Sequence, residues 1–181
     1  GCEYFCANPV DELCDGEDND CDASVDEGFV VGGRTTGDAC EDLTATLNFS
    51  DGSLAFDLDG NAGQTYRLYQ AAFGRTPDVP GLTVNVGVVD DGLTLKGLSG
   101  AFLVSAEFVA LYGADSTVDT FLTALYANVL NRAPDQAGFD SWNSLLESGQ
   151  LDRADVLIGF SESGENITLV GTAIEDGIWL A

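Results

Sequence analysis

The stretch YQAAFGRTPDVPGL at residues 69–82 recurs as YANVLNRAPDQAGF at residues 126–139. In both copies a tyrosine begins the stretch, an R-x-P-D sequence occupies its centre, and a glycine follows three residues after the aspartate. Further matches continue in register up to Glu107 and Glu165, after a one-residue insertion near Gln150. The chain therefore contains an internal repeat, with copies predicted at about 61–113 and 116–170.

Each copy is predicted to contain three helices. Tyr66, Tyr69 and Phe73 lie at helical spacing in the first helix of the first copy. The equivalent helix of the second copy is expected to follow Ser116, because Asp119 stands three residues later as in a capping box. The fold class is therefore mainly α.

The R-x-P-D sequences are expected to separate consecutive helices. Pro77 and Pro134 disfavour helical geometry in the residue before them, so a helix should end there. Asp78 and Asp135 are then placed to cap the helix that follows.

The segment after the first turn, GLTVNVGVVDDG at residues 81–92, favours a strand by local propensity because it is rich in valine. However, Leu82, Val86 and Val89 share one helical face, and the matching segment of the second copy has a plain helical pattern. We therefore predict a helix here.

Two short strands are predicted before the repeat and an apolar tail after it. Apolar residues alternate in TATLNFSDGSLAFDLD, residues 44–59, around a glycine-containing turn, which is typical of a β-hairpin. The tail, residues 167–181, is apolar and favours β structure. It must pack on its own domain or on a neighbouring molecule, and the sequence does not decide between the two.

The charge balance excludes several classes of function. The chain has 181 residues, with 31 acidic against 6 basic side chains, no histidine and a formal net charge of −25. So few basic residues argue against binding to nucleic acid or to an anionic membrane. Without histidine there is no Ser/His/Asp or Cys/His catalytic unit, and no apolar run is long enough for a transmembrane segment.

The densest acidic stretch is CDGEDNDCDASVDEG, residues 14–28. Its clustered carboxylates repel one another unless a cation such as Ca²⁺, which takes six to eight oxygen ligands, neutralises them. An ordinary EF-hand is excluded, because Phe29 stands at the twelfth position counted from Asp18. The candidate ligands are Asp15, Asp18, Asn19, Asp20, Asp22, Asp26 and Glu27. The alternative is a solvated acidic linker.

The five cysteines favour an oxidising, extracellular setting, because four of them lie in the first 21 residues. They are Cys2, Cys6, Cys14, Cys21 and Cys40. A disulfide between the two that flank the densest acidic residues, Cys14 and Cys21, would shorten the loop before metal binds. The odd number leaves one thiol unpaired or available for an intermolecular bond.

Two further polar groups allow a functional interpretation and a structural one. Asp57, Asp59 and Asn61 form a short D-x-D-x-N string that is either a second metal site or the end of the hairpin followed by a helix cap. Arg75 and Arg132 could form a paired anion site, but each guanidinium is expected to bond nearby carboxylates or carbonyls at helix ends.

The acidic stretch closely resembles CDGxDNDCDGxxDEG, the MopE-type metal-binding motif of bacterial surface proteins. Ala23 stands where that motif has glycine. The family is named after a copper-binding protein, but a chain without histidine and methionine lacks the usual copper ligands, so calcium is the expected ion.

A second resemblance covers about two thirds of the chain, from about Asp59 to the end. The segments that carry it are DGNAGQTYRLYQAAFGRTPD, FLVSAEF, LYANVLNRAPDQAGFDSW, FSESGEN and DGIWL. They resemble a bacterial domain of unknown function related to the phycobilisome-linker domain, found in S-layer, adhesin and secreted proteins. The resemblance implies a helical module of exported, often assembled proteins and no established reaction.

These features predict three segments: a Cys-rich metal-binding segment at 1–28, a hairpin linker at 29–58 and the helical repeat domain at 59–181. The expected function is an extracellular or cell-surface calcium-binding structural protein that self-assembles through its helical domain and tail. The alternative is a monomeric adhesion module that binds a glycan or protein through calcium or through Trp142 and Trp179. An enzyme is least favoured, since the matched acids Glu107 and Glu165 are expected to bond to neighbouring backbone.

Overall fold

The structure is a computed structural model of the whole chain, and it describes residues 30–31, 34–35, 46–48 and 52–181. The chain divides into two compact units, Gly1–Ala45 and Thr46–Ala181. The boundary between the two units lies inside the segment 29–58 that was predicted as a linker. The strands of the hairpin predicted at residues 44–59 belong to the second unit.

The described part of the first unit is a short hairpin. Strand β1 (Val30–Val31) pairs with β2 (Arg34–Thr35) in antiparallel register, with Val30 opposite Thr35. A Gly-Gly pair separates the two strands in the sequence, and such pairs are typical of tight hairpins. This hairpin was not predicted.

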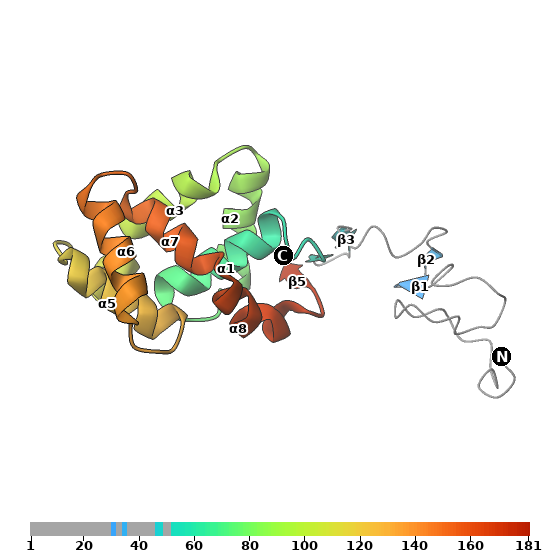
Figure 1. The fold of residues 1–181 in the computed structure, drawn as a ribbon. Helices are drawn as coiled ribbons and strands as arrows, with labels where there is room; N and C mark the ends of the chain where they lie inside the picture. Colours follow the sequence, from blue (N-terminus) through green and yellow to red (C-terminus); the bar gives the residue numbers. More distant parts are fainter. Residues whose placement is uncertain (1–29, 32–33, 36–45, 49–51) are drawn as a thin grey trace, which may run out of the picture. The chain divides into compact units, whose positions relative to one another are not determined.

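The second unit is mainly helical, as predicted (Figure 1). The described residues contain eight helices: α1 (Asn61–Phe73), α2 (Val79–Asp90), α3 (Leu95–Leu103), α4 (Ala106–Tyr112), α5 (Val118–Val129), α6 (Gln136–Glu147), α7 (Arg153–Ser161) and α8 (Gly164–Ile174). Four helices therefore begin in each range predicted for a copy of the repeat. The expectation of three was wrong.

The additional helix in each range begins at a serine cap. The Ser105 hydroxyl accepts a hydrogen bond from the backbone N–H of Phe108 at 3.2 Å, and the Ser163 hydroxyl accepts one from Asn166 at 3.2 Å. Serine at this position satisfies a backbone donor that the first turn of a helix leaves unpaired, so α4 and α8 begin as separate helices.

The R-x-P-D turns have the predicted roles. Asp78 caps α2 by accepting from the Gly81 N–H at 2.9 Å, and Asp135 caps α6 by accepting from Gly138 at 2.9 Å. The valine-rich segment is helical, as the repeat predicted. One cap differs, because Thr117 and not Ser116 accepts from the backbone of α5, at Thr120.

A three-stranded antiparallel sheet joins the start of the second unit to its end. Strand β3 (Thr46–Asn48) pairs with β4 (Ser53–Ala55), which confirms the predicted hairpin. Strand β5 (Ile178–Leu180) pairs with the other edge of β4. The apolar tail thus packs on its own domain, and the Ala181 N–H donates to the Thr83 hydroxyl of α2 at 2.9 Å.

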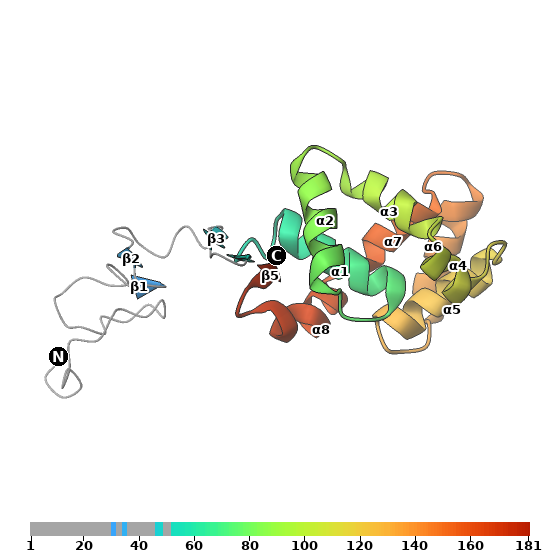
Figure 2. The same ribbon diagram turned by 180° about the vertical axis from the view of Figure 1, so that it is seen from behind.

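The core of the second unit consists of two hydrophobic clusters, and α1 contributes to both. The larger cluster includes Phe121, Leu157 and Phe160, all at most 2% exposed. The smaller one contains Ile178 of β5, so the sheet shares a core with the helices. Figure 2 shows α1 and α7 inside the helical unit.

None of the helices in the described ranges is by itself long and apolar enough to cross a bilayer. Helices α3 and α4, which are bent by 64° relative to each other, are long and apolar enough only when the two are counted together, by length and composition alone.

Candidate functional site

The predicted calcium ligands between Asp15 and Glu27 lie outside the described residues, and so do all five cysteines. The calcium site and the disulfides therefore stay predictions. Within the described ranges, there is no group of three or more Cys, Asp or Glu side chains suited to holding a metal ion.

The second predicted metal group, Asp57, Asp59 and Asn61, lies where the sheet ends and α1 begins. The Asn61 amide donates to the Asp90 carboxylate of α2 at 2.8 Å. The cap of α1 is Gly60, which has no side chain, so the alternative expectation of a side-chain cap was wrong. This end of α1 is held by backbone bonds instead, including one from the Gly63 N–H to the Asp57 carbonyl at 2.9 Å.

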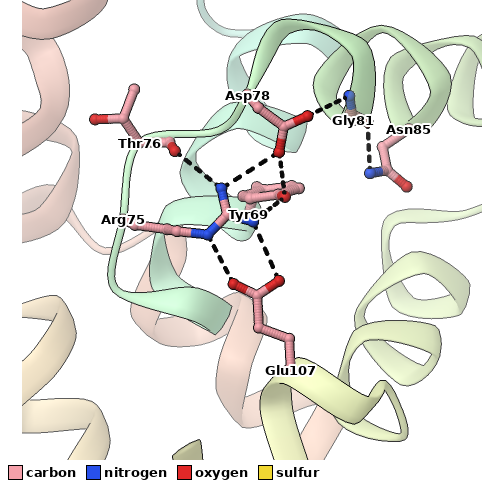
Figure 3. A network of polar contacts seen from close by, with 7 residues as sticks. All are labelled: Tyr69, Arg75, Thr76, Asp78, Gly81, Asn85 and Glu107. Carbon is pink, nitrogen blue, oxygen red and sulfur yellow. Dashed lines mark hydrogen bonds and ion pairs between the residues drawn. The ribbon is translucent and has the colours of Figure 1, made fainter.

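The most connected polar group in the described ranges surrounds Arg75, in the first R-x-P-D turn (Figure 3). Its guanidinium donates to both carboxylate oxygens of Glu107, at 2.7 and 3.1 Å, and to Asp78 at 3.3 Å. It also donates to the Tyr69 hydroxyl at 2.7 Å and lies 5.0 Å from the centroid of that ring. Arg75 thus ties the end of α1 to the beginnings of α2 and α4.

The second copy has an equivalent group around Arg132. Its guanidinium donates to both oxygens of Glu165, at 2.7 and 3.0 Å, and to Asp135 at 3.2 Å. It lies 4.9 Å from the centroid of the Tyr126 ring. The two R-x-P-D arginines therefore have the predicted structural role, and we name these two groups the arginine clamps.

The clamps correct the expectation for Glu107 and Glu165. Both residues lie in the first turn of a helix, α4 and α8 respectively, where a negative charge is favourable. Their carboxylates had been expected to bond to neighbouring backbone. They bond to arginine side chains instead. The repeat signal that relates Arg75 to Arg132 also relates Glu107 to Glu165, so the pairing could have been proposed from the sequence.

The clamps hold their acids in the charged form. Hydrogen bonds from Arg75 keep the pKa of Glu107 below its ordinary value, and Arg132 does the same for the pKa of Glu165. The backbone N–H of Gly81 is the main cause of the lowered pKa of Asp78. A carboxyl group with a lowered pKa is a poor general acid near neutral pH, so these groups suit a structural role.

The remaining basic side chains of the second unit are also used inside it. Arg67 forms an ion pair with Glu162, Lys96 contacts Asp152 at 2.9 Å and Asp155 at 2.7 Å, and Arg153 bonds the hydroxyl and carbonyl oxygens of Ser116. All five basic residues after Thr46 therefore have intramolecular oxygen partners.

The pairing of the basic residues determines what the described surface offers to ligands. A phosphate or another anion would have to compete with a carboxylate at Arg67, Arg75, Lys96 and Arg132, and with the Ser116 oxygens at Arg153. By contrast, exposed acids such as Asp91, Asp115 and Asp140 face solvent. The second unit therefore attracts cations more strongly than anions.

Comparison with protein families gives a match at residues 99–170. The matching family model is described as a domain of unknown function, DUF4214. The match runs from Ser99 in α3 to Val170 in α8, so it includes the Arg132 clamp and begins after Arg75. No curated protein matched the chain. No solved structure matched it.

Proposed function

We propose that this chain is an extracellular or cell-surface structural protein that binds calcium and self-assembles, without a catalytic role. One observation carries the proposal. The chain has 31 acidic side chains and only 6 basic ones, and the five basic residues after Thr46 already have partners within their own unit. The excess negative charge must therefore be balanced by cations from outside the chain.

Calcium is the proposed ion because of the pattern of its candidate ligands. Aspartates stand at every second position from Asp18 to Asp22. Carboxylate oxygens are the donors that Ca²⁺ prefers. Such a segment has little apolar material to bury, so its ordering would depend on the metal. The resemblance to metal-binding motifs of surface proteins supports the same assignment.

The assembly role is supported by the context of the helical unit. The DUF4214 domain at residues 99–170 fits the resemblance to domains of surface proteins. We propose in addition that the helical unit has a phycobilisome-linker-like fold and that it assembles into a filament or a surface layer.

Calorimetric titration of the metal-stripped chain with Ca²⁺ tests the metal part. We expect saturable heat that disappears in the variant Asp18→Asn, Asp20→Asn, Asp22→Asn. The control variant Asp91→Asn, Asp115→Asn, Asp140→Asn loses the same charge from the second unit and should keep the heat. Absence of binding heat in the unmodified chain, or equal loss in both variants, contradicts the calcium site.

Light scattering with and without chelator tests the assembly part. Removing divalent ions restores repulsion between acidic copies, so we expect the average mass to decrease. A monomer at high concentration in calcium would instead favour the alternative of a monomeric binding module.

A further inference from the structure

Helix α2 has apolar side chains on its outer face as well as on its inner one. Leu82, Val86 and Val89 are buried against the rest of the unit, whereas Val84 and Val88 are 65% and 38% exposed. A helix at the surface of a soluble domain normally presents polar side chains to water. Val84 and Val88 are four residues apart, so they form a single strip on that side.

This strip is also uncharged. No charged residue occurs between Val79 and Val89, although the chain as a whole has a net charge of −25. Figure 2 shows α2 on the near side of the helical unit, where it runs beside α1 and α3. The outer face of α2 is thus an uncharged apolar strip on a strongly acidic chain.

The second copy of the repeat provides an internal comparison. Helix α6 occupies the place of α2 there, and the offset of 57 residues relates Val84 to Ser141 and Thr83 to Asp140. Ser141 is exposed, and its hydroxyl donates to the Ala137 carbonyl at 2.8 Å. The fold therefore accepts a polar residue at this position, and packing within the unit does not require Val84 to be apolar.

The charge distribution indicates which molecule covers the strip. A basic partner would be drawn to the acidic parts of the surface and would leave an uncharged strip unused. Two copies of this chain repel each other wherever acidic faces meet, so contact between them is least unfavourable where both faces are uncharged. The outer face of α2 satisfies this condition for both copies.

We propose that the outer face of α2 is a contact surface between two copies of this chain. Val84 and Val88 of one copy pack against the same residues of the other, in a two-fold symmetric contact. The inference rests on the proposed self-assembly and assigns a surface to it.

The size of the strip determines how strong the contact is. A helix of 12 residues is about 18 Å long, and a standard interface buries roughly 800 Å² on each partner. One pair of α2 helices covers less than that, so the contact is weak by itself. Salt screens the repulsion between acidic copies, so the dimer becomes stronger at higher ionic strength.

Sedimentation equilibrium of the full chain in chelator tests the contact without calcium. The chain is measured from about 10 μM to about 1 mM, at roughly 0.05 M and 0.5 M NaCl. We expect a monomer–dimer equilibrium whose dissociation constant decreases as NaCl increases. A monomer under all of these conditions overturns the proposal and leaves the strip to a different molecule.

Two matched substitutions test the surface itself. Val84→Glu places a charge inside the proposed contact and should raise the dissociation constant at least about tenfold. Ser141→Glu adds the same charge at the equivalent exposed position of α6 and should change it less than about twofold. Equal weakening by both variants would indicate a general charge effect and would overturn the assignment, as would an unchanged Val84→Glu dimer. Circular dichroism checks that both variants fold.

The outcome is separable from the calcium proposal. A dimer that is sensitive to Val84→Glu, in a chain that shows no binding heat with Ca²⁺, leaves the α2 contact intact and removes the metal site. Calcium binding by a chain that stays monomeric would support the metal site and overturn the α2 contact.

Discussion

Arg67 and Glu162 lie 95 positions apart in the sequence, and their side chains form a two-pronged ion pair with N–O distances of 2.9 and 2.6 Å. The Arg67 side chain is only 3% exposed, whereas Glu162 is 22% exposed. Arg67 also donates to the Leu58 carbonyl at 2.6 Å. One guanidinium therefore ties α1, the end of α7 and the segment that leaves the sheet.

Removal of the acid should destabilise the second unit strongly. Glu162→Ala leaves the buried Arg67 charge without its partner, and we expect a loss of about 3 kcal/mol in the free energy of unfolding. Denaturant unfolding followed by tryptophan fluorescence measures it, because Trp142 and Trp179 both belong to this unit. The control Glu107→Ala removes an acid that is 43% exposed and should cost at most about 1 kcal/mol.

The double variant Arg67→Met, Glu162→Ala separates charge from packing. Replacing both charges should recover part of the loss, because no unpaired charge stays buried. If Glu162→Ala is no worse than Glu107→Ala, the ion pair does not have the role assigned to it.

The arginine clamps predict loss of stability in acid. The folded-state pKa values of Glu107, Glu165 and Asp78 are lowered from ordinary values of 4.5 for Glu and 3.8 for Asp. These groups therefore stabilise the fold above those values, and their contribution is lost as the pH falls through the lowered values. We expect the melting temperature to fall steeply below pH 4.5.

A clamp-deficient variant provides the comparison for the acid effect. Arg75→Gln, Arg132→Gln should begin with a lower melting temperature at pH 6 and lose less of it on acidification, because its acids have lost their arginine partners. Parallel curves for the two proteins between pH 6 and pH 3 would show that other carboxyl groups cause the acid sensitivity.

A tight backbone approach at the start of α1 predicts a severe glycine effect. A Cβ atom at Gly63 would overlap the backbone carbonyl oxygen of Leu58, the same group that accepts from Arg67. Gly63→Ala should therefore lower the melting temperature markedly. Gly100→Ala in α3 meets open space and should stabilise the unit by about 0.5–1 kcal/mol, because alanine favours the helix. Similar effects of the two changes would contradict the close approach.

The helical unit should be stable without calcium. Its five basic residues have internal partners, and its core contains fully buried residues such as Leu68 and Leu122. We expect the tryptophan-detected melting temperature of the full chain to change by less than about 2 °C between chelator and calcium, once the ionic strength is matched. Loss of the tryptophan transition in chelator would place a required metal ion within the helical unit.

Among the helices, the features that could be predicted from the sequence are those that occur in both copies of the repeat, whereas the β3–β4 hairpin was predicted from its own alternating apolar pattern. The turns at Pro77 and Pro134 were predicted because two copies agree, and the same agreement identified α2 as a helix against its strand propensity. The split between α3 and α4 was missed, although Ser105 and Ser163 occupy matching cap positions. A serine at a cap position is a local signal for the start of a new helix, and this signal was present in both copies.

Other features could not be predicted because they have no counterpart in the second copy. At the offsets that relate the copies, Arg67 corresponds to Ala124 and Glu162 to Val104, so the repeat gives no sign of this ion pair. The pairing of β5 with β4 joins residues more than a hundred positions apart, and short apolar strands carry little information about their partners.

The sheet also determines how the second unit would carry mechanical force. Thr46 of β3 and Ile178 of β5 both lie level with Ala55, and Asn48 and Leu180 both lie level with Ser53. The outer strands therefore run in the same direction on either side of β4. Tension between residues 46 and 180 would pull them along their length in opposite directions, so their hydrogen bonds would be loaded together in shear while the helices bear little of the load.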